Sequence, residues 1–474
     1  MGASIMPEIF KNYGERIAAI DENGRNITYE EIFRISQEIV SFIPHRTLIF
    51  SLCSNSIGSI TGYVSFLNMG IVPLLLSKHI DDVLLTNLID KYAPEYLWVP
   101  VTDIERFPKY EKLYETWEYA LLKTSLTSFP MYKELALLLT TSGSTGSPKL
   151  VKQSFRNIIA NTESIIKYLE IDSSERPITT LPMNYTYGLS IINTHLYVGA
   201  TLLLTDSTLM QKSFWDFLKK YEATSFGGVP YTYEMLKKLR FFNMPLPSIR
   251  YMTQAGGKLS PELHREFAEY AAAHGKKFVV MYGQTEATAR MAYLPSEKAI
   301  EKYGSMGIAI PGGHFRLIDV DGKEITQSNT TGELVYSGKN VTLGYAESGK
   351  DLITGDERHG VLETGDMAQR DEDGFYYIVG RKKRFLKIFG NRVNLDETER
   401  MIKTHFPQLD CACGGIDEKM YIFITNSEEI SNVRKFIADR TNLNISAFKV
   451  MYISKIPKNE SGKTLYKELE KLYK

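Results

Sequence analysis

The sequence predicts an α/β fold with a large N-terminal domain of helix-covered sheets and a small α+β domain after it. Over the first two-thirds of the chain, helical spacing of apolar residues alternates with short β-rich runs, which is typical of parallel sheets covered by helices. After about Gly304 the expected strands are separated by Asp-Gly turns, and such turns indicate antiparallel pairing. A chain of 474 residues is long enough for about three units of ~150 residues, or for one large and one small unit.

The helices and strands of the first two-thirds follow from the spacing of apolar residues. In residues 27–43, the side chains of Ile32, Ile35, Ile39 and Phe42 share one helical face. Helices are also expected at 214–221 and 261–274. Short apolar runs predict buried strands at 47–52, 97–99, 135–139, 178–181, 200–204, 225–229, 251–253 and 278–281.

The last third of the chain predicts a different organisation. Strands are expected at 314–319, 332–337 and 375–379, with turns at Asp321-Gly322 and Asp373-Gly374. The basic run Arg381-Lys382-Lys383-Arg384 follows Gly380 directly. The chain beyond it is long enough for a small α+β domain, so we expect domains at 1–382 and 383–474.

The composition excludes several classes of protein. The chain has 56 Lys and Arg and 56 Asp and Glu, whereas a binder of nucleic acid or acidic membranes is usually basic. Three cysteines cannot form a disulfide framework, and Cys411 and Cys413 are too close for a zinc quartet without a second pair. No apolar stretch approaches the ~20 residues of a membrane span, and residues 1–12 lack the apolar run of a secretory signal. We therefore expect a cytoplasmic protein in a reducing setting.

One loop has the chemistry of a phosphate-binding site. It is Thr141-Ser142-Gly143-Ser144-Thr145-Gly146-Ser147-Pro148-Lys149, between an expected strand and a helical stretch. Glycines let backbone N–H groups point outward, and the hydroxyls and the lysine add donors for phosphate oxygens. The ordinary alternative is a Ser/Gly surface loop. It is not a Walker loop, because Pro148 replaces the second glycine and Leu150 replaces the magnesium-binding hydroxyl.

Further motifs follow this loop in a fixed order, and together they resemble one family. The series resembles the adenylate-forming superfamily, which includes acyl-CoA synthetases, nonribosomal-peptide adenylation domains and firefly luciferase. It covers about two-thirds of the chain. The matching segments are Thr141–Lys149, Ala255-Gly256-Gly257-Lys258-Leu259, Tyr282-Gly283-Gln284-Thr285-Glu286, Gly332-Glu333-Leu334, Gly344-Tyr345, Thr364-Gly365-Asp366, Gly380-Arg381, Lys387, Gly390-Asn391-Arg392 and Pro457-Lys458-Asn459-Glu460-Ser461-Gly462-Lys463.

The resemblance implies attack of a carboxylate on the α-phosphate of ATP, which gives an acyl-adenylate and pyrophosphate. Because two anions must approach, the reaction requires neutralised charge and fixed positions. It implies that Glu286 binds Mg²⁺, which prefers one or two carboxylates together with phosphate oxygens. It also implies that Thr285 donates to the α-phosphate, that Tyr282 stacks against adenine, and that Asp366 and Arg381 bind the ribose. The alternatives are a surface glutamate, a core tyrosine and a turn-capping aspartate.

The resemblance also implies roles for lysines in the C-terminal part of the chain. Lys463 would meet both the carboxylate and the α-phosphate during adenylation, although the last twenty residues hold six lysines and most are expected to be solvated. The resemblance also implies that the small domain is mobile, that the antiparallel part before it is β-barrel-like, and that Lys383 is the pivot. Rotation about it would exchange Lys463 for Lys387 and open a path for a thiol. Without the resemblance, this basic run could be a nucleic-acid patch.

The acid is expected to bind near residues 181–189. The family has an aromatic or His gate where Tyr185 stands, and its amino-acid-activating members usually have an Asp where this chain has Thr186. An unpaired buried ammonium would be costly, so an α-amino acid is disfavoured and a polar or hydroxylated acid fits better. The rest of the lining is expected from Asn184, Tyr187, Gly227 and Gly228.

The expected protein is thus a ligase that uses ATP and Mg²⁺ to activate a small carboxylic acid and then transfers it to a thiol. The acceptor is coenzyme A or the phosphopantetheine of an acyl or peptidyl carrier protein. Three alternatives remain open: a free-standing amino-acid adenylation enzyme, a non-catalytic nucleotide-binding relative, and a P-loop nucleoside triphosphatase. The last would release phosphate rather than pyrophosphate.

Overall fold

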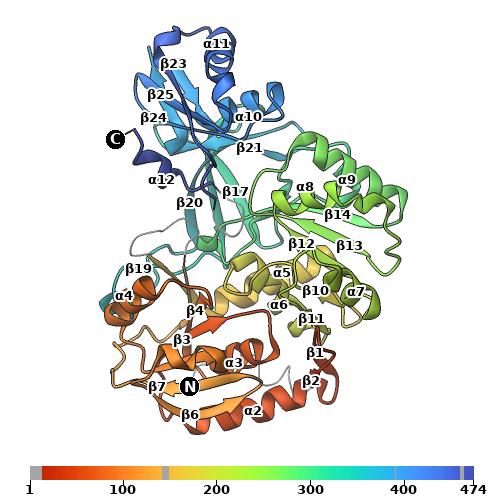
Figure 1. Cartoon of the computed structure of the whole chain (residues 1–474), viewed down its shortest axis with the longest axis vertical. Coiled ribbons are helices and arrows are strands. Elements are labelled where there is room, and N and C mark those ends of the chain that lie inside the picture. The colour runs from red at the N-terminus through yellow and green to blue at the C-terminus, as the bar shows by residue number, and fades with distance from the viewer. Residues whose placement is uncertain (1–12, 141–148, 390, 459–463, 474) are drawn as a thin grey trace. The chain divides into compact units, whose positions relative to one another are not determined.

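The computed structural model describes residues 13–140, 149–389, 391–458 and 464–473 (Figure 1). It has two compact units, each described here by itself. The first unit comprises Met1–His314 and Tyr336–Leu362, and the second comprises Phe315–Val335 and Glu363–Lys474. Among the described residues, no helix is both long and apolar enough to cross a membrane. The mixed α/β class predicted from the sequence is confirmed.

A nine-stranded sheet forms one half of the first unit. The strands from β14 to β1 pair in parallel, and β2, β15 and β16 are antiparallel to their neighbours. In spatial order the strands are β16 (Ile308–Ala309), β15 (Ala292–Tyr293), β14 (Lys277–Tyr282), β13 (Tyr251–Gln254), β12 (Ser225–Gly228), β10 (Pro177–Ile178), β11 (Leu202–Leu204), β1 (Ile17–Asp21) and β2 (Asn26–Thr28).

An eight-stranded sheet forms the other half. Its centre is parallel (β8, β4, β3 and β5), and the strands on both sides are antiparallel. In spatial order the strands are β19 (Gly344–Ala346), β9 (Leu150–Ser154), β8 (Leu135–Thr140), β4 (Val72–Ser77), β3 (Leu48–Cys53), β5 (Tyr96–Pro100), β7 (Tyr119–Lys123) and β6 (Glu111–Thr116).

Helices cover these sheets on more than one side. Side chains from α2 (Tyr29–Ser41), α3 (Ile57–Asn68), α5 (Phe155–Leu169) and α6 (Thr186–Tyr197) form a single core with side chains of both sheets. Helix α4 (Asp82–Tyr92) packs on the other face of the eight-stranded sheet. The remaining helices of the unit are α7 (Lys212–Lys220), α8 (Pro230–Lys238) and α9 (Pro261–Ala273).

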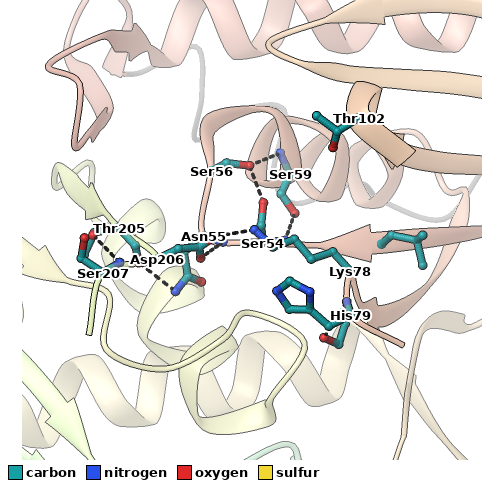
Figure 2. A network of polar contacts seen from close by, with 12 residues as sticks. Ser54, Asn55, Ser56, Ser59, Lys78, His79, Thr102, Thr205, Asp206 and Ser207 are labelled. Carbon is teal, nitrogen blue, oxygen red and sulfur yellow. Dashed lines mark hydrogen bonds and ion pairs between the residues drawn. The ribbon is translucent and has the colours of Figure 1, made fainter. Parts of the chain in front are cut away.

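A polar network links the ends of strands from the two sheets (Figure 2). Asn55 follows β3, Lys78 follows β4 and Asp206 follows β11. The Asn55 N–H donates to Asp206 Oδ1 over 3.1 Å, and Lys78 Nζ lies 2.7 Å from Asp206 Oδ2. The carboxyl ends of these strands are therefore close together, although the strands belong to different sheets.

The second unit contains smaller sheets. Most of a four-stranded sheet belongs to it, with the order β17 (Gly313–Ile318), β18 (Gly332–Gly338), β20 (Val361–Arg370) and β21 (Tyr376–Arg381). This sheet occupies the region expected to be β-barrel-like, and its β20 and β21 pair antiparallel as predicted. The later elements are β22 (Phe385–Ile388), β23 (Asn391–Asn394), α10 (Leu395–His405), β24 (Cys411–Ile416), β25 (Lys419–Ile424), α11 (Ile430–Thr441), β26 (Phe448–Tyr452) and α12 (Tyr466–Glu470).

The core of the C-terminal part joins its three-stranded sheet to two helices. Apolar side chains of β24, β25 and β26 pack with those of α10 and α11. Cys411 and Cys413 are free and buried in this core, and burial raises the pKa of both thiols. They are therefore protonated packing groups at neutral pH.

Candidate active site

Four of the predicted site segments lie at the carboxyl ends of strands in the nine-stranded sheet. Strands β10, β12, β13 and β14 are parallel neighbours in register, with Gly228 opposite Gln254 and Gln254 opposite Val280. Ligands of open α/β sheets bind at the carboxyl ends of the strands. The segments at this edge are 181–187 after β10, Gly227-Gly228 at the end of β12, 255–257 after β13 and 282–286 from the end of β14.

The expected gate and the expected adenine-side turn contact each other. Gly256 has φ of +83°, and a Cβ atom there would lie 2.5 Å from the Tyr185 hydroxyl, so this position requires glycine. The next residue, Gly257, accepts a hydrogen bond from Gln254 Nε2 over 2.9 Å. Burial raises the pKa of Tyr185 to about 12, so its phenol is neutral and can donate or accept.

Residues 282–286 form a tight turn. Tyr282 ends β14, and its hydroxyl accepts a hydrogen bond from Gln284 Nε2 over 3.3 Å. A Cβ atom on Gly283 would overlap the carbonyl of Ala289, so only glycine allows this close backbone approach. Thr285 then begins the short 3₁₀ helix η3 (Thr285–Ala287).

The Glu286 carboxylate is oriented by one phenol. Tyr345 donates to Glu286 Oε1 over 2.6 Å, while the N–H and hydroxyl of Thr342 both donate to the backbone carbonyl of Glu286 over 3.0 Å. Burial, and then the nearby Glu286 charge, raise the pKa of Tyr345 to about 12, so this donor stays protonated. Within the described part of the chain, no hydrogen bond engages Glu286 Oε2, which leaves that oxygen able to bind a cation.

The acid-pocket residues divide into two kinds. Tyr187 is buried and its hydroxyl donates to Thr253 Oγ1 over 2.8 Å, whereas Asn184 and Tyr185 are only half-buried. Thr186 donates to Thr285 Oγ1 over 2.9 Å. Position 186 therefore presents a hydroxyl next to the predicted phosphate-binding threonine, and no carboxylate.

The predicted phosphate loop lies mostly outside the described residues. The residues concerned are Thr141, Ser142, Gly143, Ser144, Thr145 and Gly146. The expectation that a helical stretch follows the loop was wrong, because β9 comes first and pairs antiparallel with β8, Thr140 opposite Leu150. The five residues of β9 include only two apolar side chains and are too few to show a helical or strand period.

Lys149, the last residue of the predicted loop, is described and has a carboxylate partner. Its ammonium forms an ion pair with Glu347 and lies 5.8 Å from the centroid of the Tyr345 ring. Because Tyr345 also donates to Glu286, one tyrosine contacts both a predicted phosphate-binding cation and the predicted magnesium ligand.

In the second unit, the two residues expected to bind ribose are neighbours. Asp366 on β20 and Arg381 on β21 are register partners, and Arg381 Nε lies 3.1 Å from Asp366 Oδ1. The Asp366 N–H donates to Thr364 Oγ1 over 3.1 Å. The side chain of Asp366 is buried and that of Arg381 is largely exposed, so the carboxylate is fixed while the guanidinium can reach outward.

The expected pivot lies between two anchored cations. Lys382 Nζ is 2.6 Å from Glu333 on β18, and Arg384 is 2.6 Å from both Asp396 and Glu399 on α10. Lys383 is the middle residue of the short 3₁₀ helix η6 (Lys382–Arg384). Of the other predicted residues here, Lys387 lies on β22 with an exposed side chain, and Gly390 and Lys463 lie outside the described residues.

One buried residue near strands β12 and β13 was not predicted from the sequence. Arg290 follows η3, and only 2% of it is exposed. Its carbonyl accepts hydrogen bonds from Asn161 and Asn340 over 2.8 and 3.1 Å. The available signal was an arginine within an otherwise small and apolar run, residues 287–294, where a charge is unusual.

Comparison with known proteins assigns the family. The model of the AMP-binding enzymes matches residues 8–346. The peroxisomal OPC-8:0-CoA ligase 1 of Arabidopsis thaliana is 26% identical over 96% of this chain and 90% of its own, and the 4-coumarate–CoA ligase-like 4 of Oryza sativa subsp. japonica is 31% identical over 71% and 63%. The o-succinylbenzoate CoA synthetase of Bacillus subtilis, solved with its acyl-adenylate intermediate, has the same fold, with a TM-score of 0.80, 21% identity and coverage of 98% and 97%. The chain belongs to the family of AMP-binding enzymes.

Proposed function

We propose that this protein is an AMP-forming ligase that joins a small carboxylic acid to a thiol. The main support is that four predicted segments lie at the carboxyl ends of four neighbouring parallel strands, in a chain of the AMP-binding family. In the first step a carboxylate oxygen attacks the α-phosphorus, the bond to the β-phosphate breaks and pyrophosphate leaves. In the second a thiolate sulfur attacks the acyl carbon and AMP leaves.

We propose a role in nucleotide binding for each of the predicted site residues. Tyr282 would stack on adenine beside the Gly256-Gly257 turn, and Thr285, held by Thr186, would donate to the α-phosphate. Asp366 and Arg381 would bind the ribose hydroxyls, because one carboxylate can accept from both. Thr141–Gly146, with Lys149, would donate to the phosphates.

The described residues fit a magnesium ion at Glu286. Its Oε1 accepts from Tyr345, which orients the carboxylate so that the other oxygen can join phosphate oxygens as a ligand. Bound there, Mg²⁺ would reduce the negative charge that the incoming carboxylate must approach. Lys463 would add a positive charge to the same step.

We propose the domain boundary at 382/383, with Lys383 as the pivot. The salt bridges on its two sides support this: Lys382 is bound to Glu333 in the part before the boundary, and Arg384 is bound to Asp396 and Glu399 in the part after it. A φ/ψ change at Lys383 would therefore move the C-terminal domain with Arg384 still attached. This rotation would replace Lys463 by Lys387 for thiol transfer.

We propose coenzyme A as the acceptor, because the two relatives described above are named as CoA ligases. The alternative acceptor is a carrier protein, and thioester formation with each acceptor distinguishes the two. An α-amino acid remains disfavoured, since Thr186 offers no carboxylate for its ammonium and the buried Arg290 adds a positive charge nearby. We place this reaction in the cytoplasm.

The test is ATP–pyrophosphate exchange over a panel of carboxylic acids, followed by thioester formation with coenzyme A or with purified carrier proteins. We expect exchange that requires Mg²⁺, and an acyl-CoA product. Exchange followed by transfer only to a carrier protein would correct the acceptor. Failure of every acid would favour a non-catalytic nucleotide-binding protein, and release of inorganic phosphate would indicate a nucleoside triphosphatase.

A further inference from the structure

A buried guanidinium lies against Tyr187, one of the predicted acid-pocket residues. Arg290 Nε donates to Ser190 Oγ, and Nη1 donates to the Tyr168 hydroxyl and to Met281 Sδ, each over 3.2 Å. Its guanidinium carbon lies 5.2 Å from the centroid of the Tyr187 ring. The acceptors are two hydroxyls and a thioether, all of them neutral and the last of them weak.

Within the described chain, no carboxylate forms an ion pair with Arg290. The buried acid Glu175, whose charge adds to burial in raising the pKa of Tyr251, already forms a salt bridge with Arg250 at 3.0 Å. Burial also lowers the pKa of His195 to about 4, so this neighbour is neutral at pH 7. Arg290 is therefore a positive charge that the described residues around it do not neutralise. Such an isolated buried cation is costly unless a ligand supplies the counter-ion.

This guanidinium lines a small cavity whose wall shares Gly227 with the proposed substrate site. The cavity has a volume of about 10 Å³, which is room for about one water molecule. Its wall includes Gly227 and Thr253, one residue before the carboxyl ends of β12 and β13, and also Ser225 at the beginning of β12. The polar part of the wall also includes Thr194, His195, Tyr251 and Arg290.

His195 is neutral and so does not change the charge beside Arg290, and its hydrogen bonds explain why it stays neutral. Its Nδ1 lies 2.7 Å from the Ile191 carbonyl and its Nε2 lies 2.9 Å from the Tyr251 hydroxyl. A neutral imidazole satisfies both, with Nδ1–H donating to the carbonyl and Nε2 accepting from the phenol. Burial likewise raises the pKa of Tyr187 and Tyr168 although Arg290 lowers it, so both phenols stay neutral.

We infer that Arg290 binds a second anionic group of the acid, so that the substrates are short dicarboxylic acids or their sulfonate analogues. This inference rests on the proposed function. One carboxylate would react at the carboxyl ends of the strands near Thr285, and the distal anion would extend past Tyr187 to Arg290 and occupy the small cavity. Because the cavity has room for about one water molecule, the distal group must be small.

The test compares acids of matched length in ATP–pyrophosphate exchange. The panel is malonate, succinate, glutarate and sulfoacetate against propionate, butyrate, valerate and acetate. We expect the wild-type protein to prefer at least one dianionic acid over its monoanionic match by ~100-fold or more in kcat/KM, because a site built for a polar group rejects analogues that lack it. Arg290→Met should lower kcat/KM for that diacid by ~100-fold or more and leave the KM for ATP unchanged.

Two further variants distinguish recognition of the substrate from structural support. Arg290→Lys keeps the charge but not the planar donor pair, so it should keep a reduced preference for the diacid even where Arg290→Met does not fold. Arg265→Met removes an exposed arginine that pairs with Glu269 on α9, and it should behave as wild type.

Three results would contradict the inference. Exchange with monoacids alone, or an equal loss for all acids in Arg290→Met, would overturn it and leave the proposed ligase activity intact. Exchange with no acid at all would overturn the proposed function and this inference together.

Discussion

Each unit of the protein contains an arginine whose side chain is largely buried, and the two differ in what neutralises them. Arg384 in the second unit has an 11% exposed side chain and lies 2.6 Å from both Asp396 and Glu399, with its guanidinium 3.7 Å from the centre of the Tyr466 ring. Arg290 in the first unit has only hydroxyl and sulfur acceptors among the described residues. A cation neutralised by its own chain is a structural element, whereas one left without a counter-ion is available to a ligand.

The largest expected effect on stability concerns Arg384. Arg384→Met should lower the free energy of unfolding of the second unit by ~3–5 kcal/mol, because it leaves the buried Glu399 carboxylate and the partly exposed Asp396 carboxylate without their cation. Arg290→Met should cost far less or even stabilise, since it removes an unpaired buried charge. Urea denaturation of both variants measures this, and equal losses would abolish the distinction between the two arginines.

Lys463 is expected to show the opposite behaviour from Arg384, with a large effect on activity and none on stability. Lys463→Ala should lower the rate of pyrophosphate exchange by ~10²–10³-fold, as loss of one preorganised transition-state donor does, while ATP still binds. Lys467→Ala, an exposed lysine on α12, is the matched control. Near-normal exchange in Lys463→Ala would remove this lysine from the mechanism.

The pivot is expected to separate the two half-reactions. Lys383→Pro fixes φ at one residue and should slow thioester formation by about tenfold or more relative to adenylation, since domain closure sets the second step. Single-turnover formation of acyl-adenylate and of thioester gives the two rates. Equal damage to both would show that Lys383 is not a pivot.

A smaller effect on stability is expected from the Tyr466 hydroxyl, which binds one of the carboxylates that pair with Arg384. Tyr466 donates to Glu399 Oε2 over 3.0 Å. Tyr466→Phe keeps the ring over Arg384 and removes only this bond, so it should lower the unfolding free energy by about 1–3 kcal/mol. A loss as large as that of Arg384→Met would mean that the ring itself is misplaced.

The smallest effect is expected at the partly exposed pair between Lys78 and Asp206 (Figure 2). Lys78→Met should change the unfolding free energy by no more than ~1 kcal/mol, and less at high salt. Asp206→Ala should cost more, because it also leaves the Asn55 N–H without its acceptor. Denaturation at low and high salt checks both expectations.

Several parts of the fold could be predicted because they depend on local pattern. The expected helix at 27–43 corresponds to α2, which begins at a Thr28–Glu31 capping box, and the expected strands at 225–229, 251–253 and 278–281 correspond to β12, β13 and β14. Helix α3 could not be found in this way, because all of its residues are buried and it has no polar face to give a helical period.

The site shows the same division between local pattern and tertiary structure. The order of short motifs was enough to reveal a resemblance to one superfamily, and that resemblance predicted the chemistry of an AMP-binding enzyme and implied the candidate residues Tyr282, Thr285 and Glu286. The charge balance around Arg290 depends on Tyr168 and Ser190, which lie 122 and 100 positions away. Only the packing of α5, α6 and β14 decides which groups surround that charge, because burial and the absence of a counter-ion are properties of the folded interior.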